Sequence, residues 1–203
     1  EGGRRGAVTA GVGRHGPGNA SDFYPTPPAA AWALRRWWGQ HNPEGPARVI
    51  DPCAGMGCLL IPWTVPRAGE DAAELLGLEG EAALVASSRR GWVEADRPAS
   101  PVRQGDGLAW LASSEDRAGH GRAELVIANP PFSRADEWVQ AVVAWVKATG
   151  SPAAVLLRSQ WIDDGNTKGR GEYRHGSAPW AILRLPWRIR FNGAGADSCT
   201  YAW

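Results

Sequence analysis

The fold is indicated first by residues 48–57, which read RVIDPCAGMG. Residues 48–51 predict a short strand that ends in an acid, and a glycine-containing turn follows at once. In an open α/β sheet, ligands bind beyond the carboxyl ends of the strands, where such turns lie. Because glycine has no Cβ, we expect Gly55 and Gly57 to let a ligand approach the backbone closely.

The same pattern of a strand with a polar end recurs downstream. Further strands are predicted over residues 75–79, 102–106 and 124–128. They end in, or run directly into, Glu79, Asp106 and Asn129. Because the carboxyl ends of parallel strands meet at one edge of a sheet, we expect these three side chains and Asp51 to gather at one rim.

Helices are predicted between the strands. Helical spacing of apolar residues extends over about 27–38, 81–90 and 135–148, and Thr26 is placed to cap the first of these helices. Later strands are predicted at 153–158, 180–185 and 200–203. Strands that alternate with helices, several of them continuously apolar, indicate an α/β fold with a parallel sheet covered on both faces.

Length and composition set the outer limits. The chain has 203 residues, a net charge of +1 and 43% hydrophobic residues, which is typical of one soluble globular domain. We expect residues 1–20, with seven glycines and three arginines, to form a flexible arm before a single domain at 21–203. No apolar run approaches the roughly 18 residues that span a membrane. Three cysteines and four scattered histidines favour neither disulfides nor a metal site, and a reduced, cytoplasmic setting fits best.

The acids at the strand ends discriminate between cofactors. Glu79 ends the second strand, where an acid can accept hydrogen bonds from ribose hydroxyls, and this would also suit NAD. However, the first loop lacks the G-x-G-x-x-G spacing and opens with Asp51-Pro52. An acid there repels a pyrophosphate but favours an ammonium or sulfonium group. The pattern therefore indicates S-adenosylmethionine.

The tetrapeptide Asn129-Pro130-Pro131-Phe132 is the most informative motif. Two successive prolines force a rigid extended turn at the strand end, so the Asn129 side-chain oxygen and the Pro130 carbonyl become two fixed acceptors. A planar amino group with two N–H donors fits this pair. When both hydrogens are accepted, the nitrogen lone pair becomes available for in-line attack on a methyl group. Phe132 is placed to stack on the ring that bears the amino group.

These two motifs, with residues 22–27 (DFYPTP), resemble the class I S-adenosylmethionine-dependent methyltransferases. The resemblance is to the adenine-N6 DNA group with an N-P-P-F signature, including phage and prophage enzymes. Residues 185–191 and 197–203 are similar to stretches of those enzymes. The resemblance covers residues 22–203. It implies a Rossmann-like, doubly wound, mostly parallel seven-stranded methyltransferase sheet.

The resemblance also implies roles for individual residues. The methionine end of the cofactor would meet the first loop and a covering segment, with Asp51, Pro52, Gly55, Gly57, Tyr24 and Thr26. Glu79, rather than Glu81, would bind the ribose hydroxyls, and Asp106 the adenine amino group. The catalytic tetrapeptide would be Asn129, Pro130, Pro131 and Phe132, holding an adenine that has left the DNA stack.

Substrate binding is the least determined part of the function. The insertion at about residues 163–178 is a candidate substrate loop, since Lys168, Arg170 and Arg174 could contact phosphate. Trp161 and Trp187 flank this loop and are candidates for contacts with the substrate. Most of the other tryptophans are interpreted as packing residues.

Three alternatives remain open at this stage. The same Asn-Pro-Pro motif serves methylation of amino groups in RNA and of a glutamine amide in proteins. The glutamine-specific enzymes usually carry Tyr after the prolines, and the RNA enzymes commonly have RNA-binding appendages. A third alternative is a catalytically idle subunit that binds nucleic acid, which the intact motifs disfavour.

Overall fold

The computed structural model describes residues 24–113, 124–163, 179, 181–190 and 196–202. The expected arm at 1–20 lies outside the described residues. So does most of the expected substrate loop, including Lys168, Arg170 and Arg174.

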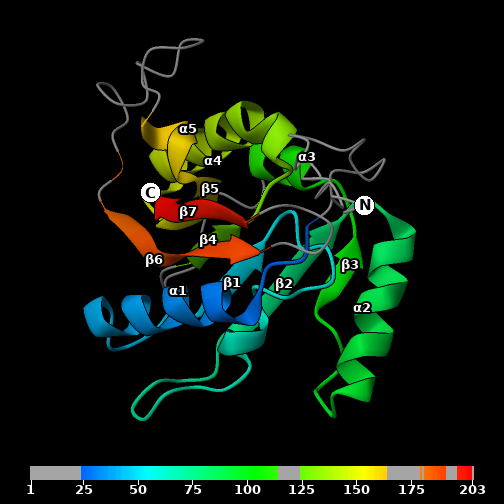
Figure 1. Ribbon diagram of the computed structural model, residues 1–203. Coiled ribbons are helices and arrows are strands. Elements are labelled where there is room, and N and C mark those ends of the chain that lie inside the picture. Colours follow the sequence, from blue (N-terminus) through cyan, green and yellow to red (C-terminus); the bar gives the residue numbers. More distant parts are fainter. Residues whose placement is uncertain (1–23, 114–123, 164–178, 180, 191–195, 203) are drawn as a thin grey trace, which may run out of the picture.

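The described residues form one mixed sheet in the order β3-β2-β1-β4-β5-β7-β6 (Figure 1). The bounds of its strands are β1 Arg48–Asp51, β2 Glu74–Glu79, β3 Val102–Gln104, β4 Glu124–Ala128, β5 Ala153–Arg158, β6 Ile182–Arg190 and β7 Ala196–Ala202. The ladders from β3 to β5 are parallel, and β7 is antiparallel to both of its neighbours. The strand order reverses between β1 and β4, which is the switch point of the sheet.

Helices cover both faces of this sheet. One face carries α1 Pro28–His41, the short 3-10 turn η1 Ile61–Trp63 and α2 Ala82–Glu94. The other carries α3 Gly107–Ala112, α4 Ala135–Thr149 and α5 Ser159–Asp163. A further 3-10 turn, η3 Phe132–Arg134, leads into α4. The prediction of an α/β fold with a mostly parallel sheet of seven strands and helices on both faces is confirmed.

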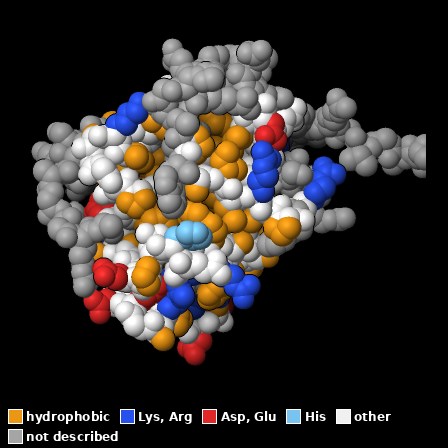
Figure 2. All heavy atoms as spheres, turned by 90° about the vertical axis from the view of Figure 1, so that its left-hand side faces the viewer, with side chains coloured by type: hydrophobic (Ala, Val, Ile, Leu, Met, Phe, Trp, Pro, Cys, Tyr) orange, Lys and Arg blue, Asp and Glu red, His pale blue; other side chains and the backbone are white. Residues whose placement is uncertain are grey.

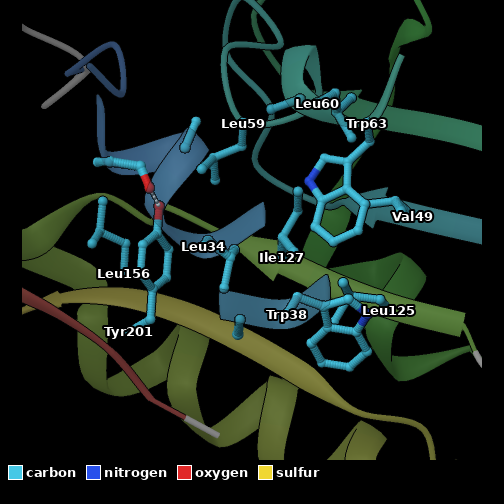
Figure 3. Packing of buried hydrophobic residues seen from close by; sticks show 14 of the residues in the cluster. Leu34, Trp38, Val49, Leu59, Leu60, Trp63, Leu125, Ile127, Leu156 and Tyr201 are labelled. Atoms are coloured by element: carbon cyan, nitrogen blue, oxygen red, sulfur yellow. Dashed lines mark hydrogen bonds between the residues drawn. The ribbon is translucent and has the colours of Figure 1, made fainter. Parts of the chain in front are cut away.

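The central strands place alternate side chains in two separate cores. Val49, Leu125 and Ile127 pack toward α1, whereas Ile50 and Val126 pack toward α4. Period-two alternation on a sheet buried on both faces requires this continuously apolar sequence. Figure 3 shows the α1 side, where Leu34 and Trp38 lie against Leu125 and Ile127. There the buried Tyr201 hydroxyl donates to the Ala30 carbonyl at 3.1 Å and ties β7 to α1.

Several local expectations were wrong, including the last strand, which begins at Ala196 and not at residue 200. Thr26 does not cap α1, since Pro27 is the N-cap and makes no side-chain cap bond, and the helix continues through Gly39 to His41. The third strand ends at Gln104 because Asp106 begins the short helix α3, which was not predicted. The sixth strand extends to Arg190 as an edge strand, where Pro186 is tolerated within a register shift between Arg184 and Arg188.

The described side chains on the face where β6 begins are of mixed type. Figure 2 shows hydrophobic side chains at the centre of that face with basic and acidic ones around them. Ile182, the first residue of β6, is 42% exposed. Within the described residues, no helix is both long and apolar enough to cross a membrane.

Candidate functional site

The polar strand ends line one cavity. A space of about 560 Å³ opens beside the carboxyl ends of β1, β2 and β4, which is where an open α/β sheet binds its ligands. Asp51, Glu79, Asp106 and Asn129 all line it, as do Tyr24, Thr26, Pro52, Pro130 and Pro131. The structure thus brings together most of the residues singled out from the sequence.

The loop after β1 is held in place by its own backbone. The Cys53 N–H donates to Asp51 Oδ1 at 3.1 Å, and the Ala54 N–H donates to the Leu78 carbonyl at 2.9 Å. Gly55 and Gly57 have φ values of 54° and 79°, a left-handed conformation that favours glycine. A Cβ on Gly57 would lie 3.0 Å from the Val102 side chain, and neither glycine lines the cavity. The structure therefore shows a conformational requirement for both glycines and a packing requirement for Gly57.

The Asp51 carboxyl is shielded from solvent. Its side chain is at the cavity wall, yet the residue is only 1% exposed. Burial raises its pKa from 3.8 to about 7, the bond from Cys53 opposes this rise, and the negative charge of Glu79 adds to it. A cationic ligand bound beside this carboxyl would favour its ionised form and lower its pKa.

Glu79 already organises two loops. Its Oε2 accepts from the Gly55 N–H and its Oε1 from the Glu81 N–H, both at 2.8 Å. Each carboxylate oxygen has two acceptor positions, so one per oxygen remains for a hydroxyl in the cavity. Glu81 also lines the cavity, but its backbone rather than its carboxylate joins this network.

Asp106 caps a helix in addition to lining the cavity. Its Oδ1 accepts from the Leu108 and Ala109 N–H groups at 2.9 and 3.1 Å and thereby caps α3. The next residue, Gly107, lies directly on the β1 loop, where an added Cβ would be 1.7 Å from the Pro52 carbonyl oxygen. Only glycine allows this approach of α3 to the loop.

Replacing Gly107 with alanine is expected to lower the free energy of unfolding by about 3 kcal/mol or more, because two backbone segments must separate. Urea unfolding followed by circular dichroism measures this. The matched control is Gly91→Ala in α2, where an added Cβ meets nothing within 4 Å. That change should stabilise by about 1 kcal/mol through helix propensity. Equal unfolding free energies for wild type and Gly107→Ala would contradict the close approach.

Asn129 has a fixed orientation. Its Nδ2 donates to the Tyr24 carbonyl at 3.1 Å and to Thr26 Oγ1 at 2.9 Å. A carbonyl only accepts, so the nitrogen must face Tyr24 and the amide cannot be turned round. Its Oδ1 is buried and, among the described residues, finds no donor. The side chain therefore keeps one buried acceptor with a fixed direction, in a residue that lines the cavity.

Phe132 is the member of the tetrapeptide that does not line the cavity. Its ring is stacked with that of Tyr24 at 6.1 Å between centroids, and the Arg158 guanidinium lies 4.7 Å from its centroid. Phe132 therefore packs against Tyr24, which belongs to the segment that accepts hydrogen bonds from Asn129. Stacking on a substrate ring would require a rearrangement of these contacts.

Sequence reasoning missed several cavity residues. Gln104, Arg134 and Trp138 all line it. Trp138 is 6% exposed, and within the described part of the chain its Nε1 has no hydrogen-bond partner. Arg134 and Trp138 lie four residues apart at the entry to α4, so helical spacing after the prolines was the available signal.

The remaining candidates are placed differently. Trp161 is half-buried, packs near α4 and donates from Nε1 to Asp136 Oδ1 at 2.8 Å. The Trp187 side chain lies outside the described residues. Cys53, Cys58 and Cys199 form no disulfide. In the parts of the chain that the structure describes, no three His, Cys, Asp or Glu side chains gather as a metal site would need.

Comparisons with known proteins place the fold. No family model and no curated protein matches the chain. Among solved structures, the methyltransferase subunit of a type I restriction-modification system from Streptococcus thermophilus aligns with a TM-score of 0.60 and 18% identity, over 91% of this chain and 45% of that one. A modification subunit assigned to a type I restriction enzyme from Vibrio vulnificus gives 0.56 and 13%, over 92% and 45%.

A protein from Pyrococcus horikoshii assigned as an RNA methyltransferase gives a TM-score of 0.55 and 15% identity, over 88% of this chain and 84% of that one. The chain spans less than half the length of the two restriction-modification subunits. At these identities the likeness concerns the fold, which is the Rossmann-like fold of these methyltransferases.

Proposed function

We propose that the protein transfers a methyl group from S-adenosylmethionine to the exocyclic N6 amino group of adenine in DNA. The observation that carries this proposal is Asn129, whose amide nitrogen is held by Tyr24 and Thr26 while its buried oxygen is left as an acceptor. A neutral acceptor fixed at the end of the central strand suits a substrate that brings N–H donors.

The cavity fits the cofactor in charge and in donors. Asp51, Glu79 and Asp106 line it together, and a ligand with an ammonium and a sulfonium group relieves the repulsion among these acids. The open acceptor positions of Glu79 suit a pair of hydroxyls. Tyr24 and Thr26 line the same cavity and accept hydrogen bonds from Asn129.

The cofactor supplies a methyl group on a good leaving group, so the protein's own task is alignment. Asn129 Oδ1 and the Pro130 carbonyl would accept the two hydrogens of the amino group and direct its lone pair. The N–C bond would form as the C–S bond breaks, S-adenosylhomocysteine would leave, and the methylated nitrogen would lose one proton to water. These acceptors also support the positive charge that develops on the nitrogen. Pro130 is buried and Asn129 is half-buried, so few water molecules compete for these bonds.

We propose DNA and not RNA as the substrate for two reasons. The chain resembles the adenine-N6 DNA group in its N-P-P-F motif, and two of its structural neighbours are subunits of restriction-modification systems. The neighbour assigned as an RNA methyltransferase makes RNA the leading alternative.

The test is methyl transfer with radiolabelled S-adenosylmethionine to unmethylated DNA, to RNA and to protein in parallel. Digestion of the product to nucleosides, followed by mass spectrometry, should identify N6-methyladenine from DNA. Label in RNA alone would move the assignment to RNA, and label in protein alone to an amide substrate. Cofactor binding without transfer to any of them would support the idle-subunit alternative.

A further inference from the structure

In the part of the chain that the structure describes, the cavity is lined by one cation and several acids. Among the described residues that line it, Arg134 is the only lysine or arginine, whereas Asp51, Glu79, Glu81 and Asp106 carry carboxylates. The Arg134 side chain is 53% exposed, which places it at the rim rather than at the floor. A polyanion that approaches such a cavity is repelled by these carboxylates, and Arg134 is the described lining residue that attracts it.

Arg134 is held by one edge of its guanidinium. Nε donates to Glu137 Oε2 at 2.7 Å and Nη2 donates to Glu137 Oε1 at 2.9 Å. These bonds use two of five N–H groups, so the edge formed by Nη1 and the second hydrogen of Nη2 remains. That edge matches two oxygens of a phosphate in the same bidentate manner.

The position of Arg134 in the chain fits the substrate that we propose. It follows Asn129 by five residues, at the end of η3 and directly before α4. When a base enters the cavity far enough for its amino group to reach Asn129, its charged phosphate must remain at the rim. The rigid turn at Pro130 and Pro131, followed by η3, connects the backbone of Asn129 to that of Arg134.

We propose that Arg134 binds the backbone phosphate next to the target base through its remaining edge, and that the negative charge of Glu137 weakens this contact. The proposal rests on the proposed function and adds to it a contact for the nucleotide backbone. Glu137 is 52% exposed, and an exposed ion pair contributes little to stability, so its charge can be removed without disturbing the fold.

Two variants should change nucleic-acid binding in opposite directions. Arg134→Gln should weaken binding of a fluorescent unmethylated DNA duplex by about tenfold at low salt and reduce the salt slope by about 1, because one phosphate contact is lost. Glu137→Gln should tighten binding by about threefold, since a nearby negative charge is lost. Fluorescence anisotropy across a salt series measures both, and calorimetry measures S-adenosylmethionine binding.

The matched control is Arg90→Gln on α2, which also removes one exposed cation but does not line the cavity. Its salt slope should equal that of the wild type. An unchanged slope in Arg134→Gln, or a loss of cofactor affinity in that variant as large as the loss of DNA affinity, would overturn the proposal. The second result would assign Arg134 to the cofactor.

The test separates this proposal from the proposed function. A normal slope in Arg134→Gln with methyl transfer to DNA intact would reject only the role of Arg134. A reduced slope on RNA, combined with no transfer to DNA, would support the phosphate contact and reject DNA as the substrate.

Discussion

Replacing Asn129 with alanine is expected to lower kcat by about 10²–10³-fold, with a much smaller effect on cofactor affinity. The variant loses the fixed acceptor that directs the substrate amino group, an interaction that becomes stronger as charge develops on the nitrogen. Single-turnover methyl transfer measures the chemical step, and calorimetry measures cofactor binding.

Asn129 also holds the covering segment, so this second role needs its own variant. Thr26→Val removes the hydroxyl that accepts from Asn129 Nδ2 at 2.9 Å but leaves Oδ1 and the Tyr24 carbonyl in place. If the acceptor role dominates, Thr26→Val should retain far more activity than Asn129→Ala. Comparable losses in both variants would show that holding the segment, rather than accepting from the substrate, is the main task of Asn129.

Replacing Asp51 with asparagine is expected to stabilise the ligand-free protein while impairing cofactor binding. The folded-state pKa of Asp51 is raised from 3.8 to about 7 by burial. Between these values the folded protein holds more protons than the unfolded chain, so wild-type stability falls as the pH rises through that window. An asparagine side chain at this position carries no such charge. The Tm of Asp51→Asn should therefore exceed that of the wild type at about pH 8, and the difference should shrink toward about pH 4.

Cofactor binding should show the opposite dependence. A cation beside Asp51 favours its ionised form, so wild-type affinity should increase by up to about tenfold per pH unit below pH 7 and level off above it. Asp51→Asn should bind about 10- to 100-fold more weakly at high pH and lose most of this dependence. Calorimetry in two buffers of different ionisation enthalpy detects the released proton. Equal pH profiles for both proteins would rule out Asp51 as the titrating group.

Most of the architecture could be predicted because its signals are local. The strands at 48–51, 124–128 and 153–158 are apolar runs with a polar residue or a breaker behind them, and their bounds agree with β1, β4 and β5. The short helix α3 could not be found in this way. Its six residues are fewer than two helical turns, and its beginning depends on the Asp106 cap rather than on periodicity.

Most of the residues at the site were predicted from the sequence, but the contacts that they make were not. Thr26 has the residue type and position of a helix cap, yet its hydroxyl accepts from Asn129, 103 residues away in the chain. Gly107 has no unusual sequence context, but it touches the Pro52 carbonyl of a loop from another strand. Phe132 follows the catalytic prolines as expected, and only its packing against Tyr24 and Arg158 shows that it lies outside the cavity lining.

The sequence by itself determined the succession of the strands and of the three longer helices, the polar residues at the strand ends and the rigid turn at Pro130-Pro131, because each depends on neighbours within a few residues. Only the tertiary structure decided which way the Asn129 amide faces, why Asp51 has a raised pKa, and that Arg134 is the cation at the rim. These properties depend on burial and on partners brought together by the sheet order. Desolvation and hydrogen bonding depend on residues that are close in space but distant in the chain. They therefore cannot be read from a residue's type and its sequence neighbours.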